Sequence, residues 1–161
     1  MQIVFITTGG TIDKVYFDQK SDFEVGDSQG PEILRESGVT LSCQFIQLFK
    51  KDSLDLTDED RQKIRETIAQ SNETRFVVTH GTDTMVQTAT FLNNLPGKTI
   101  VLTGSLTPAR FKNSDAAFNV GCALGAVQCL PPGAYIAMNG RISSPHQVRK
   151  NREANRFELV D

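Results

Sequence analysis

The chain has 161 residues, of which 39% are hydrophobic and 22% charged, and its formal net charge is −2. These values are ordinary for a globular protein, so residues 1–161 are expected to form a single domain. The small net charge gives no electrostatic reason to expect binding to nucleic acid or to a membrane. The three cysteines include no Cys-x-x-Cys pair, which argues against a disulfide framework or a zinc site. With no targeting segment or long apolar run, we expect a cytoplasmic protein.

The first predicted element is a β-strand over residues 2–8. It is apolar at almost every position, as is typical of a parallel strand that is covered on both faces. Residues 13–30 are polar and without strong periodicity, which predicts a long loop that could act as a mobile lid. A short helix is expected over residues 32–37. Residues 43–49 predict a second strand, whose mixed polarity favours an edge position.

The clearest predicted helix covers residues 57–71. Thr57 can cap it, three acidic residues fill its first turn, and Ile64 and Ile68 share one face. The elements that follow alternate strand and helix, over residues 76–79, 82–94, 99–103, 115–130 and 134–138. The tail from residue 145 onward is polar and charged.

This alternation predicts an α/β fold with a doubly wound, flavodoxin-like (Rossmann-like), mostly parallel five-stranded sheet and helices on both faces. The expected strand order is 2-1-3-4-5, which makes the first and third strands neighbours at a topological switch point. Both of these strands end in Gly-Thr turns, Thr-Gly-Gly-Thr and Thr-His-Gly-Thr. We therefore expect Thr11 and Thr82 to face each other across one crevice.

Thr82 and Asp83 are predicted to open a helix, where backbone N–H groups and the helix dipole favour anionic groups. An alcohol nucleophile also needs a base for its proton and donors for the developing oxyanion. Lys150 is a candidate partner of Thr82 by sequence alone, because the ordinary interpretation of the charged run 149–152 is a solvated face. His80 is interpreted as a strand-end histidine that bonds the local backbone rather than as a general base.

Three segments resemble, in order and spacing, the active-site motifs of the bacterial-type L-asparaginase/glutaminase family. They are Thr8-Gly-Gly-Thr-Ile12, His80-Gly-Thr-Asp-Thr84 and Val148-Arg-Lys150. The resemblance extends over about residues 2–151 and includes the connecting segment from Leu102 to Pro108. It implies an amidohydrolase that converts L-asparagine to L-aspartate and ammonia through an acyl-threonine intermediate.

The resemblance also implies roles for individual residues. Thr11 resembles the primary nucleophile of the family. Thr82, Asp83 and Lys150 resemble its second Thr-Lys-Asp group, in which the lysine helps to activate the threonine and the aspartate meets the α-ammonium of the substrate. Ser53 resembles the serine that holds the α-carboxylate. The expected catalytic residues are thus Thr11, Tyr16, Thr82, Asp83 and Lys150, and the expected substrate-binding residues are Gly10, Asp52, Ser53, Gly81 and Asp83.

The chain departs from the family pattern at three points. Phe23 stands where the family usually has a loop tyrosine, which leaves Tyr16 as the tyrosine that could take over that role. Leu54 stands where many members have glutamine, so one hydrogen bond to the α-ammonium would be missing. Typical members also have a C-terminal domain that lends an acidic residue to a neighbouring subunit, whereas this chain resembles the short, single-domain asparaginases.

Alternative functions remain open from the sequence. One is a glutaminase or related amidase with the same chemistry, and another is a module that binds asparagine or aspartate without useful turnover. A nucleotide-binding domain fits less well, because Gly9 and Gly10 are adjacent and the G-x-G-x-x-G spacing is absent. No metal or organic cofactor is expected. The expected partners are the small-molecule substrate L-asparagine and other copies of the chain in a homodimer or higher homo-oligomer.

Overall fold

The secondary structure is described for residues 1–160 of this computed structural model. The strands are β1 Ile3–Gly9, β2 Lys14–Phe17, β3 Asp22–Val25, β4 Cys43–Lys51, β5 Arg75–Thr79, β6 Thr99–Thr103, β7 Gly133–Met138, β8 Arg141–Ser143, β9 Val148–Asn151 and β10 Arg156–Leu159. The α-helices are α1 Gly30–Glu36, α2 Asp58–Gln70, α3 Met85–Leu92 and α4 Ala116–Cys129, and short 3-10 helices cover Thr11–Asp13, Ser53–Asp55 and Pro145–Gln147.

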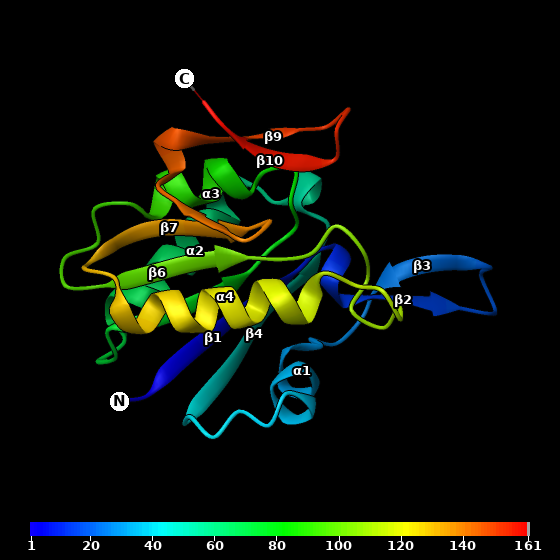
Figure 1. Cartoon of the computed structure of the whole chain (residues 1–161), viewed down its shortest axis with the longest axis horizontal. Helices are drawn as coiled ribbons and strands as arrows, with labels where there is room; N and C mark the ends of the chain where they lie inside the picture. Colours follow the sequence, from blue (N-terminus) through cyan, green and yellow to red (C-terminus); the bar gives the residue numbers. More distant parts are fainter. Residues whose placement is uncertain (161) are drawn as a thin grey trace.

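A six-stranded sheet of order β4-β1-β5-β6-β7-β8 forms the centre of the molecule (Figure 1). The strands from β4 to β7 are mutually parallel, and they correspond to the five predicted strands in the predicted order 2-1-3-4-5. The α/β fold is thus confirmed, and β4 is the edge strand that its mixed polarity predicted. The sheet has one strand more than predicted, because β8 pairs with β7 in antiparallel fashion.

Helices cover both faces of this sheet. In β1, Val4 and Ile6 belong to the core that α2 and α3 close, whereas Ile3 and Phe5 belong to the core that α1 and α4 close. All four side chains are at most 1% exposed, which explains why this run is apolar at successive positions and not in alternation. The arrangement places the carboxyl ends of β1 and β5 side by side.

The predicted helix over 57–71 is confirmed as α2. Its N-terminus is a capping box, in which Thr57 Oγ1 accepts a hydrogen bond from Asp60 N and Asp60 Oδ2 accepts one from Thr57 N. The helix expected to begin at Thr82 begins only at Met85. A hydrogen bond from Thr84 Oγ1 to the Ser53 carbonyl, 2.8 Å, holds the preceding residues in a bend outside the helix. Thr82 and Asp83 therefore precede α3.

Two hairpins lie where the sequence predicted a loop and a polar tail. β2 and β3 pair within the segment 13–30, and Figure 1 shows this hairpin extending from the body on the side of the carboxyl ends of the sheet strands. β9 and β10 pair within the tail, and their Val148 and Phe157 side chains join the core on the α2 and α3 side. Both hairpins are short and carry many charged residues, so their alternation of polar and apolar residues is weak in the sequence.

Candidate active site

Three backbone segments meet where β1 and β5 end. Gly10 has a φ of 91°, a conformation that favours glycine, and a Cβ on it would lie 2.5 Å from Gly81 Cα. A Cβ on Gly81 would in turn lie 2.9 Å from Ser53 N. Neither glycine can carry a side chain without a shift of backbone. The two Gly-Thr motifs and the segment of Ser53 are thus in direct backbone contact, although they are far apart in the sequence.

Thr82, Asp83 and Lys150 form one hydrogen-bonded group beside this junction. Lys150 Nζ donates to Thr82 Oγ1 over 2.7 Å and to Asp83 Oδ1 over 2.8 Å. The lysine comes from β9, so the hairpin that the sequence analysis missed is the element that delivers it. Arg152 Nε lies 3.5 Å from the same Asp83 oxygen, but its side chain is 67% exposed. The charged run is therefore only partly solvated.

Thr11 is the first residue of the 3-10 helix that follows Gly10, and it is half-buried. Its hydroxyl has no hydrogen-bond partner in the part of the chain that the structure describes, whereas the hydroxyl of Thr82 is bonded to Lys150. The two threonines thus differ in state. The Thr11 hydroxyl is available to a ligand, and the Thr82 hydroxyl is already oriented by a cation.

Asp52 and Ser53 are occupied by protein contacts. Asp52 forms an ion pair of 3.2 Å with Lys14 and accepts a hydrogen bond from Leu54 N. Ser53 is fully buried, and its hydroxyl accepts a hydrogen bond of 3.4 Å from Thr84 N. Ser53 therefore lies beside Gly81, but its side chain is covered in this structure.

Tyr16 lies on the β2–β3 hairpin, directly opposite Phe23 across the two strands. Its ring meets that of Phe23 edge-on at 5.3 Å, and its side chain is 52% exposed. The Phe23 ring in turn contacts Phe111 at 5.7 Å. Tyr16 and the position at which the family has its tyrosine are thus cross-strand neighbours on one face of the hairpin.

His80 is fully buried, and its ring bonds neighbouring groups at both nitrogens. Nδ1 lies 2.7 Å from the Gly81 carbonyl oxygen, and Nε2 lies 2.9 Å from Thr88 Oγ1. Burial lowers the pKa of His80 to about 4; the Gly81 carbonyl and Asp52 act in the opposite direction, and Arg61 adds to the lowering. The histidine is therefore neutral at pH 7 and bonded to local backbone, as predicted.

Asp13 was not singled out by the sequence, yet it ties down both ends of the hairpin segment. Its carbonyl accepts a hydrogen bond of 2.8 Å from Gly26 N, and its carboxylate accepts one of 2.8 Å from Gln29 N. Burial raises the pKa of this carboxyl to about 7, against the lowering effect of the Gln29 bond, and the charge of Asp27 raises it further. Aspartate is usually exposed, and nothing in the local sequence indicates that Asp13 is buried.

The raised pKa of Asp13 predicts a pH-dependent stability. The pKa of Asp13 is about 7 in the folded chain and 3.8 ordinarily. The contribution of this carboxyl to the stability of the fold is therefore complete below pH 3.8 and is lost as the pH rises through 7. Between pH 4 and 8 we expect the free energy of unfolding of the wild type to fall by about 2 to 4 kcal/mol relative to that of Asp13→Asn, a change that denaturant titrations would measure. The lowered pKa of His80 acts on both proteins and cancels in this difference. Parallel stability curves would contradict the prediction, and Asp18→Asn, on the exposed hairpin turn, is the matched control.

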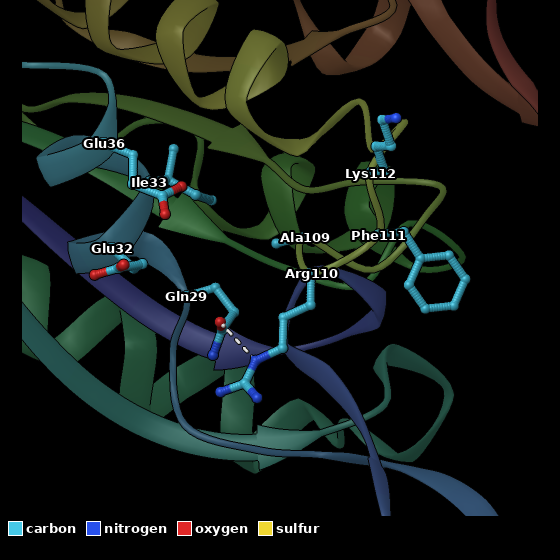
Figure 2. Close-up of a pocket in the computed structure, with 8 residues that line it drawn as sticks. All are labelled: Gln29, Glu32, Ile33, Glu36, Ala109, Arg110, Phe111 and Lys112. Carbon is cyan, nitrogen blue, oxygen red and sulfur yellow. Dashed lines mark hydrogen bonds between the residues drawn. The ribbon is translucent and has the colours of Figure 1, made fainter.

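Neither Thr11 nor Thr82 lines the two surface hollows described here. One of about 690 Å³ lies between α1 and the loop 109–112, and Figure 2 shows Arg110 bonded there to the side chain of Gln29. A smaller one of about 370 Å³ is lined by residues 149–153, including Lys150. The chemistry of the side chains, and not the size of a hollow, therefore identifies the candidate site.

None of the helices described within residues 1–160 has the length and apolar character of a membrane-spanning segment.

Comparisons with known proteins show which family the whole domain resembles. The family model described as "Asparaginase, N-terminal" matches residues 2–159. The L-asparaginase of Thermococcus kodakarensis is 32% identical over 158 residues, which are 93% of this chain and 48% of that protein. Its solved structure superimposes with a TM-score of 0.86 at 27% identity, covering 99% of this chain and 51% of that one.

Two further relatives carry different names. A glutaminase-asparaginase of Acinetobacter glutaminasificans is 26% identical over 92% of this chain and 49% of its own length. A probable periplasmic L-asparaginase of Haemophilus influenzae is 36% identical over 65% of this chain and 32% of its own length. The fold and the site together define a class of protein: a doubly wound α/β domain with a Thr-Lys-Asp group at the carboxyl edge of its sheet. The chain belongs to the asparaginase family, and it spans about half the length of the Thermococcus kodakarensis L-asparaginase.

Proposed function

We propose that this chain carries an L-asparaginase-type site, which hydrolyses the side-chain amide of L-asparagine to L-aspartate and ammonia. The observation that carries the proposal is the hydrogen-bonded group of Thr82, Asp83 and Lys150 beside the contact of Gly10 with Gly81. That contact places the second threonine motif against the turn that presents the unbonded hydroxyl of Thr11. The chemistry of the two threonines requires no metal or organic cofactor.

In the proposed mechanism, Thr11 Oγ1 attacks the amide carbon of the substrate. A base, either Tyr16 on a closed hairpin or a water molecule, takes the hydroxyl proton, and backbone N–H groups hold the oxyanion. The base returns this proton to the amide nitrogen, the carbon–nitrogen bond breaks, ammonia leaves, and an acyl-threonine remains. A water molecule positioned by Thr82 and Lys150 then attacks the acyl carbon, which releases L-aspartate and restores Thr11.

The proposed substrate contacts require small rearrangements. Asp83 keeps Oδ2 for the α-ammonium, because Lys150 and Arg152 both contact Oδ1. Ser53 is buried, so its hydroxyl would have to leave Thr84 N before it could hold the α-carboxylate. The bond to be broken is long, 3.4 Å, and therefore weak. Leu54 is 62% exposed and offers the substrate no hydrogen bond.

Ammonia release by the purified protein from L-asparagine and from L-glutamine tests the proposal. Release from asparagine that depends on Thr11 would support it. A larger turnover on glutamine would favour the glutaminase alternative, to which the name of the Acinetobacter relative gives weight. Saturable binding of L-asparagine or L-aspartate without release would favour a binding module, an outcome that the half-length match to the relatives makes worth testing.

The role proposed for Tyr16 predicts the result of a hydroxyl exchange across the hairpin. Tyr16→Phe should lower kcat by about 100-fold, the usual size of a lost proton transfer, with the ring contact to Phe23 kept. Because Phe23 lies directly opposite, Tyr16→Phe combined with Phe23→Tyr should recover part of the activity. Steady-state kinetics of both proteins would decide. An unchanged kcat in Tyr16→Phe would assign the proton to a water molecule instead.

Three further expectations belong to the same proposal. We infer a cytoplasmic location, to which the name of the Haemophilus relative offers the periplasmic alternative, and cell fractionation distinguishes the two. We infer a homodimer or higher homo-oligomer, which light scattering after size-exclusion chromatography would detect. We also infer that residues 1–161 fold as one domain, which a single cooperative melting transition would support.

A further inference from the structure

A buried chain of hydrogen bonds runs from α2 to the Gly81 peptide, outside the proposed catalytic group. Arg61 Nε donates to Thr88 Oγ1 over 3.0 Å, Thr88 Oγ1 contacts His80 Nε2, and His80 Nδ1 contacts the Gly81 carbonyl. All three side chains are at most 3% exposed. They come from α2, from α3 and from the residue that follows β5, so these hydrogen bonds join three segments that are separate in the sequence.

Each bond of this chain can have only one direction. A carbonyl oxygen cannot donate, so His80 must donate from Nδ1 to Gly81. Thr88 Oγ1 accepts from the guanidinium of Arg61 and uses its own proton toward His80 Nε2. The other guanidinium nitrogens of Arg61 bond the Leu56 carbonyl, Asp58 and Gln87, which fix the arginine at its end of the chain. The imidazole is thereby held as the Nδ1–H tautomer.

This direction determines which way the next peptide faces. In a trans peptide the C=O and the N–H point to opposite sides, and the described residues contain no cis peptide bond. His80 draws the Gly81 carbonyl inward, so the N–H of Thr82 points away from the histidine. Among residues 1–160 no acceptor is found for this N–H.

We propose that Arg61, Thr88 and His80 are positioning residues, which fix the Gly81–Thr82 peptide for the hydrolysis under "Proposed function", on which this inference rests. These hydrogen bonds, called the lock below, hold the backbone and touch no reacting atom. It sets the direction of the Thr82 N–H and, through the contact of Gly81 with Gly10, the turn that presents Thr11. Loss of the lock should therefore lower the rate of the reaction more than the stability of the fold would explain.

The decisive variant is Thr88→Val, which keeps the shape of the side chain and removes the hydroxyl. Thr99→Val is a matched control, because Thr99 is also buried and accepts a hydrogen bond of 2.8 Å from an arginine, Arg75, at the opposite end of the sheet. We expect similar losses of Tm in both variants. Only Thr88→Val should lower kcat for L-asparagine, by about tenfold to 100-fold, as small misplacements of reacting groups do. Thr88→Ser, which restores the hydroxyl, should recover most of the rate.

Nitrogen-15 NMR of the histidines gives a readout that does not depend on turnover. The chain has two, His80 and His146, so His146→Gln assigns the signals. We expect the Nδ1–H tautomer at His80 in the wild type and, in Thr88→Val, a shifted Nε2 signal, because Nε2 loses the donor that Thr88 supplied. An Nε2–H tautomer in the wild type, or equal kcat in Thr88→Val and Thr99→Val, would overturn the inference. A wild type that releases no ammonia would refute the proposed function, while the NMR result would still decide the direction of the lock.

Discussion

Thr11→Ala is expected to lower ammonia release from L-asparagine by about 10³-fold or more, because the variant has no hydroxyl with which to form the acyl-enzyme. The expectation rests on the difference between the two threonines. Thr82 is bonded to Lys150 and 6% exposed, whereas Thr11 is half-buried and has an unbonded hydroxyl among the described residues. An alcohol that already accepts a hydrogen bond from a cation is a weaker nucleophile than a free one. Thr11 is therefore assigned the attack.

Thr11→Ser is the matched control for this variant. It keeps the hydroxyl and should retain measurable turnover, while both variants should melt close to the wild type because the Thr11 side chain makes no hydrogen bond within residues 1–160. Release of ammonia by Thr11→Ala at nearly the wild-type rate would refute the assignment. In that case Thr82→Ala would show whether the roles of the two threonines are exchanged.

The central sheet could be predicted from the sequence because each of its parallel strands is covered on both faces. Such strands are continuous apolar runs, and β1 with its buried Ile3, Val4, Phe5 and Ile6 is the clearest of them. The hairpins could not be predicted in the same way. In β9, Val148 alone of four residues is buried, so the strand is indistinguishable from a charged loop until its partner β10 is known.

The candidate site was predictable to the extent that it depends on short motifs. Gly10 and Gly81 stand out because two predicted strands each end in a Gly-Thr turn, and the contact between the two glycines leaves no room for a side chain at either. The neighbourhood of Lys150 was not predictable from local pattern, because its position depends on a hairpin 67 residues from Asp83 in the sequence. The burial of Ser53 and Asp13 likewise depends on how three segments pack together, which no local periodicity encodes.

Lys150→Met is expected to lower steady-state turnover by about 100-fold to 10³-fold and to change the time course of the reaction. Methionine keeps much of the length of the side chain but cannot donate to Thr82 Oγ1 or to Asp83 Oδ1, the two bonds of 2.7 and 2.8 Å that Lys150 makes. Because ammonia leaves when the acyl-enzyme forms, and Lys150 is assigned to the water attack that follows, the first turnover should remain fast. A rapid-mixing assay should show about one ammonia per site followed by a slow phase.

The same experiment separates the lysine from the charge around it. Arg149 is the neighbouring exposed cation on β9 and forms no ion pair within residues 1–160, so Arg149→Gln removes one positive charge without touching Thr82. It should leave both phases unchanged. If Lys150→Met lost the fast phase as well, the lysine would be needed for the attack of Thr11, and the group of Thr82, Asp83 and Lys150 would serve acylation. The burst therefore decides which chemical step the second threonine serves. If Lys150→Met keeps the burst, the acyl-enzyme still forms and the lysine serves its hydrolysis; if the burst is lost, the lysine serves the formation of the acyl-enzyme.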